Sequence, residues 1–216
     1  MNVDRPTGMC LVQRAAGTIL RPAFFTGMPS TPTYPARTAE AILYHIALGS
    51  NLGDRMEHLQ NAIDELDTEP GCRVVAISSV WETEAHVKPG ASLQPNYLNA
   101  VLACRSALPP ELMLRTLVHI EAQQGRESSA KGSWQPRPLD LDIVLAGITT
   151  MRTDSLTLPH PRLAERRFVL APLAEIAADV QVPAPFDHRV GYLLQTCPDQ
   201  TDITRTHHSL RLPRSA

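Results

Sequence analysis

Two aspartates stand one residue apart in an otherwise apolar segment, LDLDIVLAG at residues 139–147. Because alternate residues of a β-strand share a face, Asp140 and Asp142 would lie on one side of a sheet, roughly 7 Å apart at Cα. Two partly desolvated like charges repel each other unless a cation lies between them. The pair predicts Mg²⁺, which binds one or two carboxylates and completes its octahedron with water and substrate phosphates. The alternative is a solvated strand face on which each aspartate pairs with an arginine or a lysine.

The segment before these aspartates, GRESSAKGSWQPRP at residues 125–138, combines three cations with one tryptophan. A loop of this length between a helix and a strand is typical of a lid or a binding element. Arg126, Lys131 and Arg137 beside an acid pair suit a polyphosphate, because arginine binds phosphoryl oxygens in a bidentate way. Trp134 could cover a flat ring or exclude water. The alternative is a solvated charged loop whose tryptophan packs back on the domain.

These residues must be positioned by elements that alternate between strand and helix periodicity. Strands are predicted at residues 43–49, 72–83, 96–106 and 139–147, and helices at 54–66 and 109–125. Asp54 with Glu57 forms a capping box, Pro110 suits the first turn of the second helix, and Gly125 suits its C-cap. The order βαββαβ predicts an α+β, ferredoxin-like fold, an antiparallel sheet of four strands with both helices on one face. A C-terminal helical segment within residues 158–177 is expected to pack on the same core.

Composition excludes several other classes of protein. The chain has 216 residues, a formal net charge of −2 and an isoelectric point near 6.4, so no overall positive field attracts a nucleic acid. No apolar run is long enough to span a membrane. The cysteines are far apart, which favours reduced thiols in the cytoplasm over disulfides or a zinc site. They are Cys10, Cys72, Cys104 and Cys197.

We expect one domain at residues 41–196. Residues 1–40 are rich in arginine and proline, which is typical of a disordered N-terminal extension. An organellar transit peptide, or a start upstream of the true initiator Met28, would also explain this composition. The polar, aperiodic residues 197–216 are predicted to be a disordered tail.

Five motifs together resemble a known enzyme family. They are HIALGSNLGDR, NYLNAV, IEAQQGR, WQPRPLDLDIVL and LPHPRLAERRFVLAPLAEIA, spread over residues 44–182. In this order and spacing they resemble the 6-hydroxymethyl-7,8-dihydropterin pyrophosphokinase family of folate biosynthesis. The resemblance implies a ferredoxin-like fold and transfer of the pyrophosphoryl group of ATP to the hydroxymethyl group of the pterin, with release of AMP. It also implies two Mg²⁺ ions, ATP as co-substrate and no partner beyond the two small molecules. We expect a monomer.

The resemblance also implies roles for individual residues. Asp140 and Asp142 would bind the two Mg²⁺ ions, and with Arg126 and Arg137 they form the expected catalytic set. The pterin would be bound by Thr83, Tyr97, Asn99, Trp134 and Phe168. ATP would be bound by Glu121, Arg126, Lys131, Trp134, Arg137, Ile143, Thr157, His160 and Arg166. No dedicated general base is expected, because in-line transfer depends mainly on positioning and charge neutralisation; Asp142 or a metal-held water is the candidate proton acceptor.

Some of these residues have simpler interpretations. Tyr97 and Phe168 could be core aromatics, Glu121 a surface charge of a helix, and His160 a turn histidine bonded to the backbone. The residues 83–90, TEAHVKPG, depart from the proline-rich loop usual in the family. Two other functions remain open from the residues: another Mg²⁺-dependent transferase that uses nucleotides, and a non-catalytic ferredoxin-like binding module.

Overall fold

The computed structural model describes residues 41–85, 94–125 and 135–213. Its first half contains β1 (Ile42–Ser50), α1 (Arg55–Thr68), β2 (Cys72–Ile77), β3 (Trp81–Thr83), β4 (Tyr97–Ser106), α2 (Pro110–Gln123) and β5 (Asp140–Ala146). Its second half contains β6 (Met151–Arg152), β7 (Thr157–Leu158), a 3-10 helix (Leu163–Glu165), α3 (Arg167–Ala177), α4 (Val190–Gln195) and β8 (Ile203–Arg205). The predicted N-terminal extension, residues 1–40, lies outside the described residues.

Within the described ranges, six strands form one antiparallel sheet. Its order is β5-β1-β4-β3-β8, and β2 also pairs with β4. The strands β5, β1, β4 and β2 with helices α1 and α2 make the βαββαβ arrangement, which confirms the predicted α+β, ferredoxin-like fold. The sheet is wider than the predicted four strands, because β3 and β8 extend it.

The helix ends follow the expected local chemistry. The Asp54 side chain accepts a hydrogen bond from the backbone N–H of Glu57 at 3.0 Å and so caps α1. Pro110 occupies the first turn of α2. Gly125 follows that helix with a φ of +89°, a left-handed conformation that a glycine adopts without strain. The predicted starts of both helices and the role of Gly125 at the end of α2 are therefore confirmed, whereas α1 continues two residues beyond its predicted end at residue 66.

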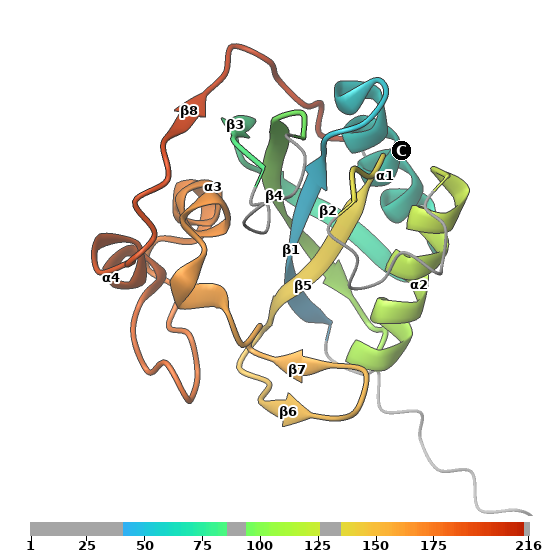
Figure 1. The fold of residues 1–216 in the computed structure, drawn as a ribbon. Coiled ribbons are helices and arrows are strands. Elements are labelled where there is room, and N and C mark those ends of the chain that lie inside the picture. Colours follow the sequence, from blue (N-terminus) through green and yellow to red (C-terminus); the bar gives the residue numbers. More distant parts are fainter. Residues whose placement is uncertain (1–40, 86–93, 126–134, 214–216) are drawn as a thin grey trace, which may run out of the picture. The chain divides into compact units, whose positions relative to one another are not determined.

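The sheet is covered on both faces, and this corrects one prediction. Helices α1 and α2 lie on one side of it and α3 and α4 on the other (Figure 1). Leu102 of β4 and Ile143 of β5 belong to the core under α1 and α2. Val101 and Val144, their neighbours along the two strands, pack instead in a second core with α3 and α4. The C-terminal helical segment was expected on the first core; it covers the opposite face because β4 and β5 are apolar on both sides.

Two further predictions about strands are wrong. The single strand expected at residues 72–83 is divided into β2 and β3 at Ser78, whose hydroxyl accepts a hydrogen bond from the N–H of Val101 at 2.9 Å. The tail expected to be disordered forms β8, which pairs with β3. It belongs to the same compact unit as the rest of the described chain, Ala39–Ala216. The described helices include none with the length and apolarity needed to cross a membrane.

Candidate active site

Two cavities, each of about 310 Å³, open beside the aspartate pair. The first is lined by residues predicted to bind the pterin, namely Thr83, Tyr97, Asn99 and Phe168. The second is lined by residues predicted to bind ATP, namely Glu121, Ile143, Thr157 and His160. Asp140 and Asp142 line both cavities. Arg137 and Arg166, expected on the ATP side, line the first cavity.

The register of the central strands brings these groups together. Gly49 of β1 pairs with Asn99 of β4 on one side and with Asp140 of β5 on the other. A Cβ atom at Gly49 would lie 3.3 Å from Asn99 Oδ1 and 3.6 Å from Tyr97 Cδ1. The absence of a side chain at Gly49 therefore leaves the space in which the groups from β4 and β5 approach each other.

The lining of the first cavity includes a buried polar pair and two aromatic rings. Asn99 is 5% exposed, and its Nδ2 donates to the Thr83 hydroxyl at 2.9 Å. Tyr97 and Phe168 are half-buried and line the same cavity, and Phe168 also packs against the second core. Such a combination suits a flat ligand with hydrogen-bonding groups at its edge.

Each aspartate forms an ion pair with an arginine. Arg137 Nη1 lies 3.0 Å from Asp140 Oδ1, and Arg166 Nη1 lies 3.2 Å from Asp142 Oδ2. Burial opposes the charged form of Arg137, yet Asp140, Tyr97 and Glu121 together outweigh it, so the pKa of Arg137 is raised. Arg166 also lies 5.8 Å above the ring of Phe168. The alternative interpretation was that each aspartate pairs with an arginine or a lysine on a solvated strand face. The pairing is present, but both arginines line the first cavity.

A buried asparagine that the sequence analysis missed holds Arg137 in place. Asn51 is 1% exposed; its Oδ1 accepts from the Arg137 N–H at 2.8 Å, and its own N–H donates to the Arg137 carbonyl at 3.1 Å. Its Nδ2 donates to the Pro95 carbonyl at 3.2 Å. The signal was present in the motif HIALGSNLGDR, which contains Asn51.

Glu121 is buried rather than on the surface. It is 3% exposed, and its Oε1 accepts a hydrogen bond from the Leu141 N–H at 2.7 Å. Leu141 stands between the two aspartates on β5, so Glu121 fixes the strand from which both carboxylates project. The interpretation of Glu121 as a surface charge is wrong.

His160 combines a turn position with a place at the second cavity. Its N–H donates to the Val144 carbonyl at 3.0 Å, and its Nδ1 accepts from the Arg162 N–H at 3.1 Å. Burial, together with the positive charge of Arg166, lowers the pKa of His160. Because Nδ1 accepts the Arg162 N–H, the ring proton lies on Nε2, and Nε2–H is the donor that the ring can offer to a ligand.

Three predicted site residues, Arg126, Lys131 and Trp134, lie outside the described residues. Half of the described residues that line the first cavity were not predicted, among them the polar Glu84, Gln94 and Arg162. Nowhere in residues 41–85, 94–125 and 135–213 do three or more His, Cys, Asp or Glu side chains gather closely enough to hold a metal. Two aspartates are nevertheless the donor set that fits Mg²⁺, because this ion takes its other oxygens from water and phosphates.

Comparison with known proteins decides the family. The family described as 7,8-dihydro-6-hydroxymethylpterin-pyrophosphokinase (HPPK) matches residues 45–178. The chain belongs to this family. It is 37% identical over 177 residues to a 2-amino-4-hydroxy-6-hydroxymethyldihydropteridine pyrophosphokinase from Synechocystis sp., covering 82% of this chain and 84% of the relative. It is also 37% identical over 154 residues to the enzyme of that name from Pseudomonas aeruginosa, covering 71% of this chain and 91% of the relative.

A solved structure supports the fold independently. A crystal structure of a Plasmodium falciparum HPPK-DHPS triple mutant superposes with a TM-score of 0.56 at 12% identity, over 74% of this chain. This chain spans 45% of that solved chain, so the likeness concerns the HPPK-like fold only.

Membership of the HPPK family establishes the reaction. The chain is a diphosphotransferase that moves the pyrophosphoryl group of ATP to the hydroxymethyl group of 6-hydroxymethyl-7,8-dihydropterin in folate biosynthesis, and AMP is released. ATP is its co-substrate. The two alternatives left open by the residues, another Mg²⁺-dependent transferase and a non-catalytic module, are set aside by this match.

Proposed function

We propose that the first cavity binds the pterin, that the second binds ATP, and that Asp140 and Asp142 hold two Mg²⁺ ions where the cavities meet. The observation that carries this proposal is that both aspartates line both cavities. A group transfer requires its two substrates to meet at the reacting atoms, and these carboxylates stand at that junction.

The pterin is bound by stacking and by hydrogen bonds to its edge. Tyr97 and Phe168 contribute the flat apolar surfaces, and Asn99 contributes amide donor and acceptor groups from the cavity wall. The Thr83 hydroxyl accepts from Asn99 Nδ2 and so fixes which amide atom faces the ligand. Buried, oriented amide groups of this kind reject ligands that cannot pair with them.

ATP is bound by neutral and cationic donors. Nε2–H of His160 donates to a phosphate oxygen from the second cavity, and Arg137 and Arg166 neutralise charge on the phosphoryl group that is transferred. Both arginines are paired with aspartates in the described structure. When bound, Mg²⁺ would neutralise phosphate charge at the aspartates. This would leave the arginines to contact phosphoryl oxygens.

The reaction is an in-line displacement at the β-phosphorus of ATP. The hydroxymethyl oxygen of the pterin forms a new bond to this phosphorus, and the bond from it to the oxygen of the α-phosphate breaks, so that AMP leaves. Asp142 is the candidate acceptor of the hydroxyl proton. The arginines stabilise the charge that spreads over the transferred group, which lowers the barrier more than a strong base would.

We also propose that the chain acts as a monomer. The described cysteines, Cys72, Cys104 and Cys197, are free thiols, which supports the cytoplasm as its compartment.

Substitution of Asn99 tests the assignment of the cavities. We expect Asn99→Ala to weaken pterin binding by about 10- to 100-fold, the loss of one or two buried hydrogen bonds, and to change the affinity for a nonhydrolysable ATP analogue by less than about twofold. Isothermal calorimetry with each ligand measures both values. Asn96→Ala is the matched control, because Asn96 is exposed on the same segment. Equal losses of pterin and nucleotide affinity would contradict the assignment.

A further inference from the structure

The C-terminal residues 198–213, here called the strap, cross three elements of the domain. Near its start, Asp199 accepts a hydrogen bond from the Arg167 N–H at the beginning of α3. In its middle, β8 pairs with β3. Toward its end, the Arg211 N–H donates to Gln60 Oε1 of α1 at 2.8 Å, and Gln60 Nε2 donates back to the Arg211 carbonyl at 3.1 Å. The strap therefore has anchors at both ends as well as along its length.

The strap supports β3, the short strand that carries Thr83. The register pairs Thr83 with Ile203 and Trp81 with Arg205, so β3 is enclosed between β4 and β8 rather than left at an edge. The Thr206 N–H donates to the Val80 carbonyl at 2.9 Å, and the Thr206 hydroxyl donates to the same oxygen at 3.0 Å. These bonds fix the backbone that leads into the proposed pterin cavity.

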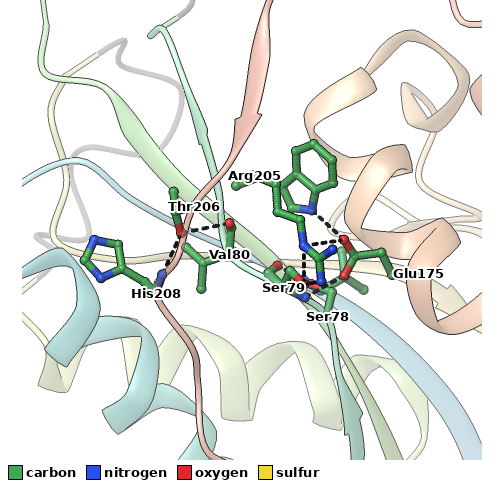
Figure 2. A network of polar contacts seen from close by, with 9 residues as sticks. Ser78, Ser79, Val80, Glu175, Arg205, Thr206 and His208 are labelled. Carbon is green, nitrogen blue, oxygen red and sulfur yellow. Dashed lines mark hydrogen bonds and ion pairs between the residues drawn. The ribbon is translucent and has the colours of Figure 1, made fainter.

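A side chain from α3 completes the support of β3. Figure 2 shows Glu175 and Arg205 meeting at Ser79, just before β3. Glu175 Oε2 accepts from the Ser79 N–H at 2.7 Å, and its Oε1 accepts from Trp81 Nε1–H at 3.1 Å. Arg205 Nε donates to the Ser79 hydroxyl at 2.9 Å and lies 3.6 Å from Glu175 Oε1. The strap, β3 and α3 thus meet in one polar network.

Asp199 links the strap to the other wall of the cavity. Its Oδ2 accepts from the Arg167 N–H at 3.1 Å, and its Oδ1 accepts from the Thr201 N–H at 2.9 Å. The N-cap residue of α3, Arg166, makes no side-chain cap bond of its own, so a carboxylate distant in sequence supplies the acceptor that the first turn requires. Arg166 and Phe168, on either side of Arg167, both line the cavity.

We propose that the strap is a positioning element for the pterin cavity and that Asp199 is its principal positioning residue. The inference rests on the proposed function of that cavity. The strap joins the wall that carries Thr83 to the wall that carries Arg166 and Phe168, and among the described residues that line the cavity none comes from the strap. It therefore acts on the ligand through the two walls and sets their separation, which a stacked flat ring requires to be constant.

The competing explanation is that the strap stabilises the whole fold without a specific effect on one ligand. The two explanations differ in what happens to the second cavity. Its lining comes from α2, β5 and the segment 153–161, none of which the strap contacts through the hydrogen bonds described above. A positioning role therefore predicts a loss of pterin affinity that exceeds the loss of nucleotide affinity, which the strap reaches only through Arg166, and that does not follow thermal stability.

The test compares Asp199→Ala and Asp199→Asn in the full chain with Asp202→Ala as a matched control. Asp202 is an exposed carboxylate of the same strap. Calorimetry measures the dissociation constants of 6-hydroxymethyl-7,8-dihydropterin and of a nonhydrolysable ATP analogue with Mg²⁺, and thermal melting measures stability. We expect Asp199→Ala to raise the pterin dissociation constant about tenfold and the nucleotide constant less than about twofold. Asp199→Asn keeps an acceptor oxygen and should restore pterin affinity to within about threefold, while Asp202→Ala should match the wild type.

Each result has a defined meaning. Wild-type pterin affinity in Asp199→Ala, or equal losses for both ligands, would overturn the proposal. If Asp199→Ala does not fold, Arg205→Ala takes its place, because this substitution removes the link to Ser79 and Glu175 and changes only an exposed side chain. Unchanged pterin affinity in Arg205→Ala would also overturn the proposal.

The variants also separate a failure of the strap inference from a failure of the cavity assignment. If Asn99→Ala weakens pterin binding and the strap variants do not, only the strap inference fails. If none of these variants affects pterin binding, the assignment of the cavity itself fails.

Discussion

At the scale of single residues, the site pairs two aspartates with two arginines. Asp140 and Asp142 stand on one face of β5, and each is neutralised by an arginine that also lines the first cavity. Removal of one partner would leave a partly buried charge without compensation. In the proposed mechanism, divalent ions bind the two aspartates and the two arginines turn to phosphate oxygens.

Asp142→Asn tests the proposed metal ligands. Asparagine is nearly isosteric, so the fold should persist, whereas loss of the carboxylate should lower kcat by two or more orders of magnitude through weaker metal binding. Steady-state kinetics over a range of Mg²⁺ concentrations measure the effect. Asp179→Asn is the control, because Asp179 forms an exposed ion pair with Arg189 away from both cavities. Turnover near the wild-type value in Asp142→Asn would refute the assignment of the metal ligands.

His45 provides a pH-dependent contribution to stability. The residue is 3% exposed, and its Nδ1 is buried without a hydrogen-bond partner in the described part of the chain. Burial lowers the pKa of His45 from 6.5 to about 4. Between these two values the unfolded chain binds a proton that the folded chain does not, so the free energy of unfolding decreases as the pH falls through this window. The full effect is about 3 kcal/mol, since one pKa unit corresponds to about 1.4 kcal/mol.

Replacement of His45 should remove this dependence. We expect the wild type to lose about 3 kcal/mol more than His45→Phe between pH 6.5 and pH 4, as measured by urea unfolding at several pH values. His119→Phe changes an exposed histidine of α2 and should keep the wild-type profile. Parallel profiles of wild type and His45→Phe would show that His45 is not the group responsible.

At the scale of elements, the junction of α2 with β5 positions the acid pair. Glu121 of α2 accepts the Leu141 N–H between the two aspartates. We expect Glu121→Ala to lower the free energy of unfolding by about 1–3 kcal/mol, because a buried N–H loses its acceptor, and to reduce kcat as β5 loosens. Glu121→Gln keeps an acceptor oxygen and should recover most of both losses. Chemical unfolding measures the stability of both variants, and steady-state kinetics measure their kcat. A Glu121→Ala variant as stable and active as the wild type would exclude this positioning role.

The sheet itself shows why a central strand is hard to interpret from its sequence. Strand β4 is buried along most of its length, because α1 covers one face and α3 the other. The alternation expected for a half-exposed strand is therefore absent from its burial. In the same way β3 and β8, each three residues long, have no strong pattern of their own. They are stable because they pair with each other and because β3 also pairs with β4.

At the scale of the whole molecule, two cavities share one pair of carboxylates, and this predicts coupling between the ligands. We expect a nonhydrolysable ATP analogue with Mg²⁺ to strengthen pterin binding by about tenfold or more, because ions and phosphates at the aspartates complete one wall of the pterin cavity. Calorimetry of pterin binding with and without the analogue measures this coupling free energy. Asp142→Asn should reduce it, and equal pterin affinities under both conditions would contradict a shared junction.

Much of the fold could be predicted from local pattern. Asp54, Pro110 and Gly125 act through neighbours in sequence, so their capping roles are visible in the chain itself. The alternation of strand and helix periods predicted the order βαββαβ, and the spacing of Asp140 and Asp142 predicted that they share a face. The resemblance of the motifs indicated the family and twelve of the 28 described residues that line the two cavities.

The contacts that required the tertiary structure join residues far apart in sequence. Asn51 holds Arg137, Glu121 holds Leu141, and Asp199 caps α3, each across a separation that no periodicity encodes. The second core and the strap also depend on contacts between residues far apart in sequence. Local pattern reports which face of an element is apolar, whereas strand register and packing determine which distant groups that face meets. The sequence thus specified the elements and the chemical groups of this protein, and only folding decided how those groups pair.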